Sequence, residues 1–553
     1  MTLASHPPAD PGSRPAGGAP LAYGVAGVLL LVPAAAELLS VIGFAAGRPI
    51  GASHLALALG VAAAATLALG ALDGAPLRRT CAALGLGAAV LGASAFVAAS
   101  CWDFSYDGQA YHQSAISLLA RGWNPLAGPL TPEDTVHRLW IEHYLRGPEL
   151  GAAVTYAATG SLEVGKAFGF GLLAATALLV ATALRRAGAS PLLAMAGGTL
   201  AAANPIALSQ LATFYVDGQL ALLFTCAVAL AFLALRTPLR SAWPLLATAL
   251  GLLAQVKFTG IVYAVLLLLG MAVVACRAAR PPGAPWRVLA LGVAVGAATL
   301  LVGSQPLLTN TRDHRHPFFP LAGAGAVDIV SGQAPRFPAR GTLARFVVST
   351  FSESSAGREA PVPKWPFVVR PRELDAMAEA DVRVAGFGPL FALALVLCAL
   401  GAGYHEVARR RRPSPASSGL LVAAWVLATA AVNPAAWWAR YVPQVWLATL
   451  IAAVALSASV RGPARWLGVA ALVVLGADAA LVGASVAQRQ VETQAAAVAQ
   501  LRDLARAGPE VVMERGDMES LQARLETAGL RASYRARCER AMPLVGASTW
   551  TCR

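Results

Sequence analysis

The chain has 553 residues and a formal net charge of +14; 57% of its residues are hydrophobic and only 13% are charged. Soluble domains carry about 25% charged residues, so this composition excludes a soluble enzyme, a disordered chain and a fibrous protein. It predicts an all-α polytopic membrane protein, because long apolar runs satisfy their backbone in lipid as helices. The positive charge comes mainly from arginines in short loops, a pattern typical of membrane proteins rather than of nucleic-acid binding.

Residues 1–20 are rich in proline, glycine and alanine and are predicted to form a disordered cytoplasmic tail. Apolar runs of about 17–25 residues, the length that crosses a bilayer, follow them. We divide the long run 242–276 at Lys257, because two short helices with a charged turn are less costly than a lysine in mid-membrane. The thirteen predicted spans are 21–45, 52–72, 80–101, 164–183, 191–211, 217–235, 242–256, 259–276, 288–305, 387–404, 419–433, 441–459 and 465–487.

The arginines indicate how the chain is oriented. They gather in alternate loops, which places those loops and the N-terminus on the cytoplasmic side of a bacterial inner membrane. Three long hydrophilic segments then face the periplasm, namely 102–163, 306–386 and 488–553. We therefore predict a membrane domain over 21–487 with two large outer loops and a periplasmic C-terminus.

Residues 488–553 are predicted to form a small extracytoplasmic α/β module. It would hold helices at 491–507 and 517–528 and a strand at 511–513. Cys538 and Cys552 are the only cysteines in a polar segment, and an oxidising compartment favours a disulfide between them.

The densest group of reactive side chains comes directly after the third span, between Trp102 and Gln113. It holds Asp103, Asp107, Tyr111 and His112, and Asp107 shares a face with Tyr111 if a helix begins near Asp107. Two interpretations stay open from the residues alone. Asp107 caps this helix while the aromatic residues form an interfacial belt, or the segment is catalytic.

The order Asp107-x-x-x-Tyr111-His112, followed by Gly122-Trp123-Asn124-Pro125, resembles the membrane glycosyltransferases of the GT-C fold. The similarity is closer to family-39-like, polyprenyl-phosphate-dependent enzymes, which share their general plan with the lipid A aminoarabinose transferase and the protein O-mannosyltransferases. Two extra spans before the acidic loop depart from that plan. Further matching segments lie at 143–149, 165–167, 214–218, 257–260, 316–320 and 437–441.

The resemblance implies an inverting hexosyl- or pentosyltransferase that works at the outer face of the membrane. Its donor would be a polyprenyl-phosphate-linked sugar, and its acceptor a hydroxyl of a lipid, a glycan or a protein. The resemblance gives Asp107 the role of the base that takes the hydroxyl proton, with Asp103 as the second choice. Lys257 and Arg440 are expected to meet beneath Asp107 and bind the donor phosphate; the alternative is snorkelling to lipid headgroups.

Other polar residues are candidates for binding the sugar or the acceptor: His112, Tyr111, Asp217, His143 and Glu149. Each also has a structural interpretation, and Asp217 would serve as a helix cap. Some GT-C enzymes use a divalent cation such as Mg²⁺ or Mn²⁺, and the sequence does not decide whether this chain does. The alternative function is a transporter or flippase of a lipid-linked envelope precursor, although no internal repeat supports it.

Overall fold

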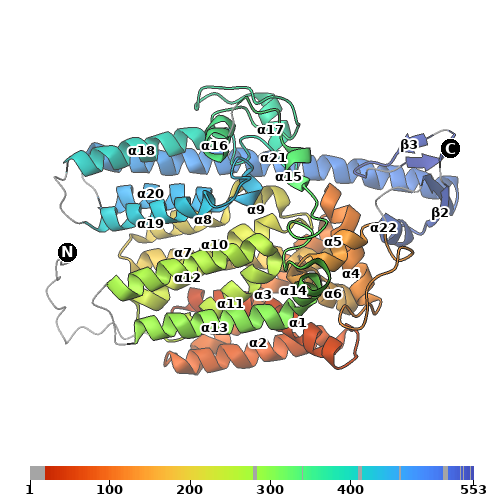
Figure 1. Cartoon of the computed structure of the whole chain (residues 1–553), viewed down its shortest axis with the longest axis horizontal. Coiled ribbons are helices and arrows are strands. Elements are labelled where there is room, and N and C mark those ends of the chain that lie inside the picture. The colour runs from red at the N-terminus through yellow and green to blue at the C-terminus, as the bar shows by residue number, and fades with distance from the viewer. Residues whose placement is uncertain are drawn as a thin grey trace.

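The computed structural model describes residues 19–277, 283–338, 341–408, 414–459, 462–514, 521–535, 537–539, 541–547 and 550–552. These residues form a bundle of long helices that run side by side, with a small sheet beyond one end of the bundle (Figure 1). The fold is therefore mostly helical, as the composition predicts.

Nine helices of the described residues are long and apolar enough to cross a membrane, which is consistent with a multi-pass membrane protein. They are α1 (Leu21–Ala45), α2 (Ser53–Leu72), α3 (Leu77–Ser100), α7 (Ala167–Arg186, preceded by the short turn η2, Leu162–Lys166), α10 (Asp217–Arg236), α12 (Phe258–Arg277), α13 (Ala284–Val302), α18 (Phe391–Ala408) and α21 (Pro463–Ala507). Four shorter apolar helices accompany them: α8 (Pro191–Ala202), α11 (Ala242–Val256), α19 (Pro415–Ala430) and α20 (Gln444–Ser459). Each predicted span overlaps one of these helices, but among the described residues only nine of the thirteen helices have the length of a membrane span.

Two breaks interrupt the apolar runs. Lys257 has an extended backbone (φ −169°, ψ 168°) between α11 and α12, so the predicted division at this lysine is confirmed. The span predicted over 191–211 is broken as well, because α8 ends at Ala202 and a short helix, α9 (Pro205–Gln210), follows. The Asn204 side chain accepts a hydrogen bond from the Ile206 N–H (3.0 Å), which caps the new helix.

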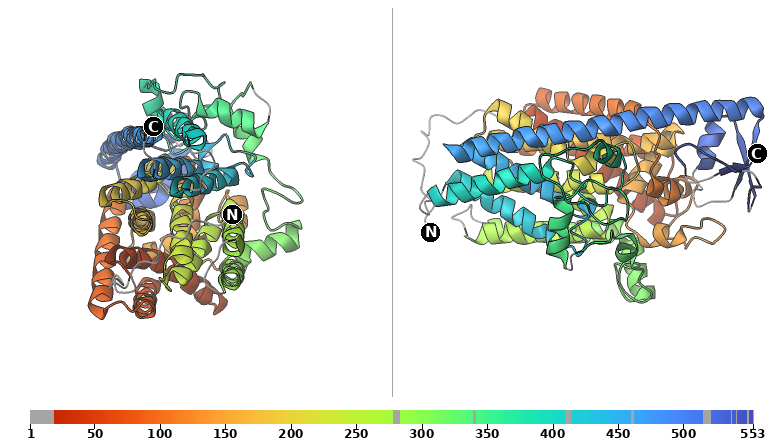
Figure 2. Two further views of the ribbon diagram at one scale, coloured as in Figure 1. Left: turned by 90° about the vertical axis from the view of Figure 1, so that its left-hand side faces the viewer. Right: turned by 90° about the horizontal axis from the view of Figure 1, so that it is seen from above.

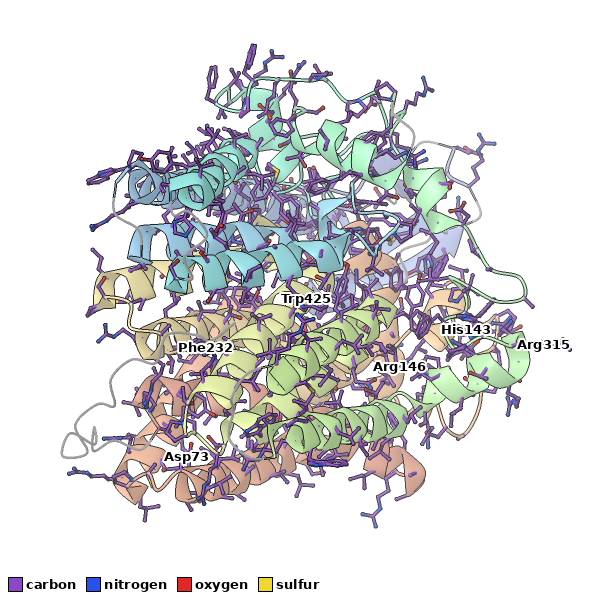
Figure 3. The ribbon with its side chains drawn as sticks, turned by 60° about the vertical axis from the view of Figure 1, so that its left-hand side comes forward. Asp73, His143, Arg146, Phe232, Arg315 and Trp425 are labelled. Carbon is purple, nitrogen blue, oxygen red and sulfur yellow. A yellow bond between two sulfur atoms is a disulfide. The ribbon has the colours of Figure 1, made fainter. Side chains whose placement is uncertain are left out.

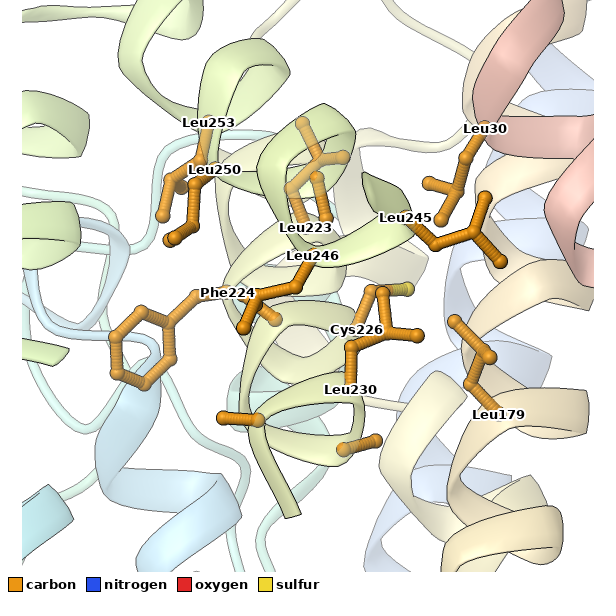
Figure 4. Close-up of a cluster of buried hydrophobic side chains, with 14 of the residues drawn as sticks. Leu30, Leu179, Leu223, Phe224, Cys226, Leu230, Leu245, Leu246, Leu250 and Leu253 are labelled. Carbon is orange, nitrogen blue, oxygen red and sulfur yellow. The ribbon is translucent and has the colours of Figure 1, made fainter. Parts of the chain in front are cut away.

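Helix α10 lies at the centre of the bundle. Its leucines and Phe224 pack against α7 and α11 in a core built mainly of leucine and alanine, part of which Figure 4 shows. A helix that is apolar all round is one that is buried on every side, and 78% of the apolar window of α10 is buried, against 17% for α2. Helix α10 is therefore held by protein, and α2 is a peripheral helix.

The two ends of the bundle differ in character. Helices α4 (Gln113–Ala120), α5 (Arg138–His143), α6 (Gly147–Thr159) and α14 (Ser304–His314) gather at the end nearer the C-terminal sheet (Figure 1). In Figure 3, His143, Arg146 and Arg315 lie at this end, and Asp73 lies at the other. The segment 306–386 also forms α15 (Ile329–Gln333), α16 (Thr342–Thr350) and α17 (Pro371–Met377). Both predicted outer loops thus contain short helices joined by irregular segments.

Helix α21 runs without a break through the predicted domain boundary at residue 488. At 1.5 Å per residue its 45 residues span about 68 Å, and its last turns extend past the bundle to the sheet (Figure 2). The module adds β1 (Glu510–Glu514), α22 (Leu521–Thr527), β2 (Arg531–Arg535), β3 (Ala541–Pro543) and β4 (Trp550–Cys552), in the sheet order β2-β1-β4-β3. Strand β1 pairs parallel with β2 and antiparallel with β4. The first strand and both helices were predicted from the sequence, whereas β2, β3 and β4 were not.

A disulfide joins Cys538 to Cys552, whose Cα atoms are 5.0 Å apart, as predicted. In the unreduced, denatured protein we expect an alkylating reagent to label five of the seven cysteines, and all seven after reduction. The bridge closes a loop of 14 residues, so the chain-entropy model gives it about 3 kcal/mol of stability. Labelling of all seven thiols without reduction would contradict the bridge and would count against the predicted periplasmic location of the C-terminus.

Candidate active site

A cavity of about 1460 Å³ lies at the end of the bundle that carries α5 and the C-terminal sheet. Of the nine predicted site residues, the seven that line this cavity are Asp107, Tyr111, His112, Glu149, Asp217, Lys257 and Arg440. The remaining walls come from the segments 137–146, 321–333, 356–358, 379–383 and 432–441, and from Gly546 and Ala547 of the C-terminal module. The structure therefore brings together residues from segments that are far apart in the sequence, between Phe104 and Ala547.

The segment that carries Asp107 is not an ordinary helix start. The backbone of Asp107 is already helical and its side chain makes no capping hydrogen bond, so the capping interpretation is wrong. The first turn, η1 (Gly108–His112), is a π-helix, whose hydrogen bonds join residues five apart. This wider turn carries His112 onto the face that Asp107 and Tyr111 already share, and all three line the cavity.

Gly108 allows this turn to lie close to the preceding residues. A Cβ atom at Gly108 would overlap the Asp103 carboxylate and the Ser105 hydroxyl. The close approach brings the buried Asp103 under the start of the π-helix. Any larger residue would push the Asp107 backbone away from the cavity wall.

Two cations, Lys257 and Arg440, meet three carboxylates in one wall of the cavity. Arg440 Nη1 lies 3.5 Å from Asp107 Oδ2 and 3.7 Å from Asp217 Oδ2, and its Nε lies 3.3 Å from Asp381 Oδ1. Lys257 Nζ forms an ion pair with the same Asp217. The predicted convergence of Lys257 and Arg440 beneath Asp107 is confirmed, and the Arg440 side chain, only 12% exposed, is no snorkelling arginine.

Aromatic rings hold the two cations in place. The Arg440 guanidinium lies 4.5 Å from the ring centre of Trp438, 5.2 Å from that of Tyr441 and 5.4 Å from that of Tyr215. Lys257 Nζ lies 4.7 Å from the ring centre of Tyr441. Cation–π contacts of this kind stabilise a partly desolvated cation. Both charges therefore have a fixed position in the cavity wall.

Asp381 is a site residue that the sequence analysis missed. It accepts a hydrogen bond from Trp438 Nε1 (2.9 Å) and also faces Arg383 at 3.3 Å. Burial raises the pKa of the Asp381 carboxyl, although Arg440 and Arg383 act in the opposite direction. No motif surrounds this residue, and its place in a predicted outer loop is the one signal that pointed to it.

His112 and Glu149 form a buried pair at the cavity wall. His112 Nδ1 lies 2.5 Å from Glu149 Oε1. Burial alone lowers the pKa of His112, but the Glu149 carboxylate outweighs it, and the net effect is a raised pKa. The pair therefore favours a protonated imidazole that faces the cavity as a hydrogen-bond donor.

Asp103 is fully buried and does not line the cavity, so the structure does not support it as the second-choice base. Its Oδ1 accepts hydrogen bonds from Ser105 N–H (2.7 Å) and Oγ–H (2.6 Å), and its Oδ2 accepts one from the Phe214 N–H (2.9 Å). Asp103 instead fixes the Asp107 segment to the loop before α10.

His143 is a second correction, because it too lies outside the cavity lining. Its Nδ1–H donates to Asn310 Oδ1 (2.6 Å), and its ring packs edge-on against Phe319. His143 therefore joins α5 to α14 and the loop that follows it, and a role in binding substrate is not supported.

A divalent cation does not fit the described side chains well. Among the described ranges, no group of three or more His, Cys, Asp and Glu side chains is arranged to hold a metal ion. The carboxylates that do come together, Asp107, Asp217 and Asp381, already surround Arg440, and Asp217 also pairs with Lys257. We therefore derive no step through Mg²⁺ or Mn²⁺.

Comparison of the chain with family models, with curated proteins and with solved structures finds no match. Its function must therefore be inferred from the chemistry of the cavity.

Proposed function

We propose that the chain is an inverting glycosyltransferase of the GT-C type in a bacterial inner membrane. It would move a hexosyl or pentosyl group from a polyprenyl-phosphate donor to a hydroxyl of a lipid, glycan or protein acceptor at the periplasmic face. One observation carries the proposal. A partly exposed carboxylate, Asp107, shares a cavity wall with two fixed cations, Lys257 and Arg440.

The reaction needs a proton acceptor and a stabilised leaving group. Asp107 takes the proton of the acceptor hydroxyl as its oxygen attacks the anomeric carbon. The bond between that carbon and the phosphate oxygen breaks on the opposite face of the sugar, which inverts the configuration, and the electron pair leaves with the polyprenyl phosphate. Arg440 and Lys257 stabilise the charge that grows on the phosphate.

The separations around Arg440 support its role as a phosphate ligand. Its nitrogens lie 3.3–3.7 Å from three carboxylates, which is longer than the roughly 2.7–2.9 Å of a charge-assisted hydrogen bond. A phosphate oxygen that arrives in the cavity would form shorter bonds than these carboxylates make. Arginine matches phosphate with two parallel hydrogen bonds.

The space available suits a large, two-part substrate. The main cavity exceeds the roughly 300–1,000 Å³ typical of sites for one small ligand. A second, apolar cavity of about 320 Å³ lies between α12, α13 and α14, lined by residues such as Ile261, Leu268 and Val295. Phe318 in its wall lies 5.1 Å from Phe258 in the wall of the main cavity, measured between ring centres. The isoprenoid chain of the donor is expected to occupy this apolar space.

The test is donor cleavage by the purified protein in lipid nanodiscs. With a polyprenyl-phosphate sugar and an extract of envelope acceptors, we expect release of free polyprenyl phosphate and transfer of the sugar. A transporter or flippase would leave the donor intact. Glycan and lipid profiling of a deletion strain, in which one sugar should be missing, then identifies the acceptor.

A further inference from the structure

The C-terminal module lies directly against the segment that carries Asp107. Arg524 on α22 is the centre of this contact, with a side chain only 11% exposed. Its Nη2 donates to the Asp103 carbonyl (2.9 Å) and to Glu163 Oε1 (2.9 Å). Its guanidinium also lies 5.0 Å from the ring centre of Trp102 and 5.4 Å from that of Phe104. The Arg524 side chain thus contacts Asp103 and both of its neighbours in the chain, Trp102 and Phe104.

Helix α21 holds the same segment from a second direction. Gln490 Nε2 donates to the Trp102 carbonyl (2.8 Å), and Gln494 Oε1 accepts a hydrogen bond from the Trp102 N–H (3.1 Å). Gln494 Nε2 also donates to the Ser100 carbonyl (2.7 Å). These bonds satisfy backbone groups at the point where α3 ends, which the helix itself cannot satisfy.

A third contact comes from the segment between β3 and β4, which lies inside the loop that the Cys538–Cys552 disulfide closes. Gln109 Nε2 donates to the Gly546 carbonyl (2.7 Å). Gly546 has φ +71°, and a Cβ atom there would overlap the Phe104 ring, so the turn needs glycine. Gly546 and Ala547 themselves line the cavity.

From these contacts we propose that the C-terminal module completes the active-site cavity and that Arg524 is a positioning residue for the Asp107 segment. The inference rests on the proposed function for its catalytic consequence, but not for the contact itself. Asp107 can accept a proton only where the segment 102–109 places it, 3.5 Å from Arg440. A displacement of about 1 Å at a reacting group costs roughly a hundredfold in rate.

Hydrogen–deuterium exchange of the full-length protein tests the contact without any substrate. In Arg524→Ala we expect the amides of residues 102–112 to exchange at least about tenfold faster, because a hydrogen bond to a charged group contributes that much to local opening. Arg506→Ala is the matched control, since its side chain is 80% exposed and pairs only with Asp503 among the described residues. Unchanged exchange in Arg524→Ala would overturn the inference. If that variant does not fold, Gln494→Ala takes its place, because it removes two hydrogen bonds to the backbone of residues 100 and 102. The amides of residues 102–112 must then exchange faster in Gln494→Ala.

Donor turnover tests the catalytic consequence. We expect Arg524→Ala to lower kcat by about one to two orders of magnitude with little change in KM for the donor, because the phosphate ligands are untouched. Arg524→Lys should recover part of this loss. A raised KM with a normal kcat would overturn the positioning role. Faster exchange in a protein that cleaves no donor even as wild type would refute the proposed function and leave the module–segment contact established.

Discussion

Replacement of Asp107 by asparagine is expected to lower sugar transfer by about two to four orders of magnitude, the usual weight of a general base. Asparagine has the same shape but cannot take the proton of the acceptor hydroxyl. The Asp107 side chain is 24% exposed and pairs with Arg440 at 3.5 Å, so the loss of its charge costs the fold little. Arg440 keeps two further carboxylate neighbours, Asp217 and Asp381.

The measurement is release of polyprenyl phosphate by wild type and variant at matched amounts of folded protein. Asp313→Asn is the control, because Asp313 lies outside the cavity lining with a side chain 46% exposed, and it should transfer at the wild-type rate. Asp103→Asn should instead reduce folded yield, since the Asp103 carboxylate accepts four hydrogen bonds within the protein. A fully active Asp107→Asn would remove Asp107 from the mechanism.

Hydropathy and charge placed most of the membrane helices correctly because each depends on a local property. A run of apolar residues has one stable state in lipid, and a lysine in the middle of such a run forces a break, as at Lys257. The convergence of Lys257 and Arg440, which both contact Asp217, was predictable for a related reason. Both cations lie beside aromatic residues and away from the arginine-rich loops. The rule that relates loop arginines to the orientation of the chain in the membrane therefore does not explain them.

The features that the sequence analysis missed depend on contacts between distant segments. The π-turn after Asp107 follows from how closely Gly108 approaches Asp103, and no period in the sequence reports that approach. Asp381 belongs to the site because Trp438 donates a hydrogen bond to it and Arg440 forms an ion pair with it. His143 looked equally reactive, yet Asn310 engages it in a structural contact. Residue type alone does not separate these two cases.

The strands β2, β3 and β4 were missed because they are short. Strands of three to five residues give too little alternation of apolar and polar side chains to be recognised. Their sheet is held by a small core, in which Leu525 and Met513 are almost fully buried, and by the Cys538–Cys552 bridge. The fold of the module was therefore only partly predictable, and its contact with the Asp107 segment was not predictable at all.

Replacement of Arg440 by lysine is expected to lower donor turnover by about two to three orders of magnitude, the usual cost of removing one donor that stabilises developing charge. Lysine keeps the positive charge but loses the planar fork that binds two phosphate oxygens. It also loses the close contacts with Trp438, Tyr441 and Tyr215. The free energy of unfolding should fall by less than about 2 kcal/mol, because the three carboxylates still face a cation.

The lysine variant is more informative than alanine. Alanine would leave Asp107, Asp217 and Asp381 without their shared cation, and removal of one partner from a buried ion pair destabilises a protein by about 3–5 kcal/mol. Arg312→Lys is the matched control, since Arg312 is 75% exposed and pairs with Asp313 outside the cavity lining. We expect the control variant to turn over donor at the wild-type rate. If Arg440→Lys keeps full turnover with a folded cavity, then the guanidinium does not bind the leaving phosphate, and Lys257 alone must stabilise its charge.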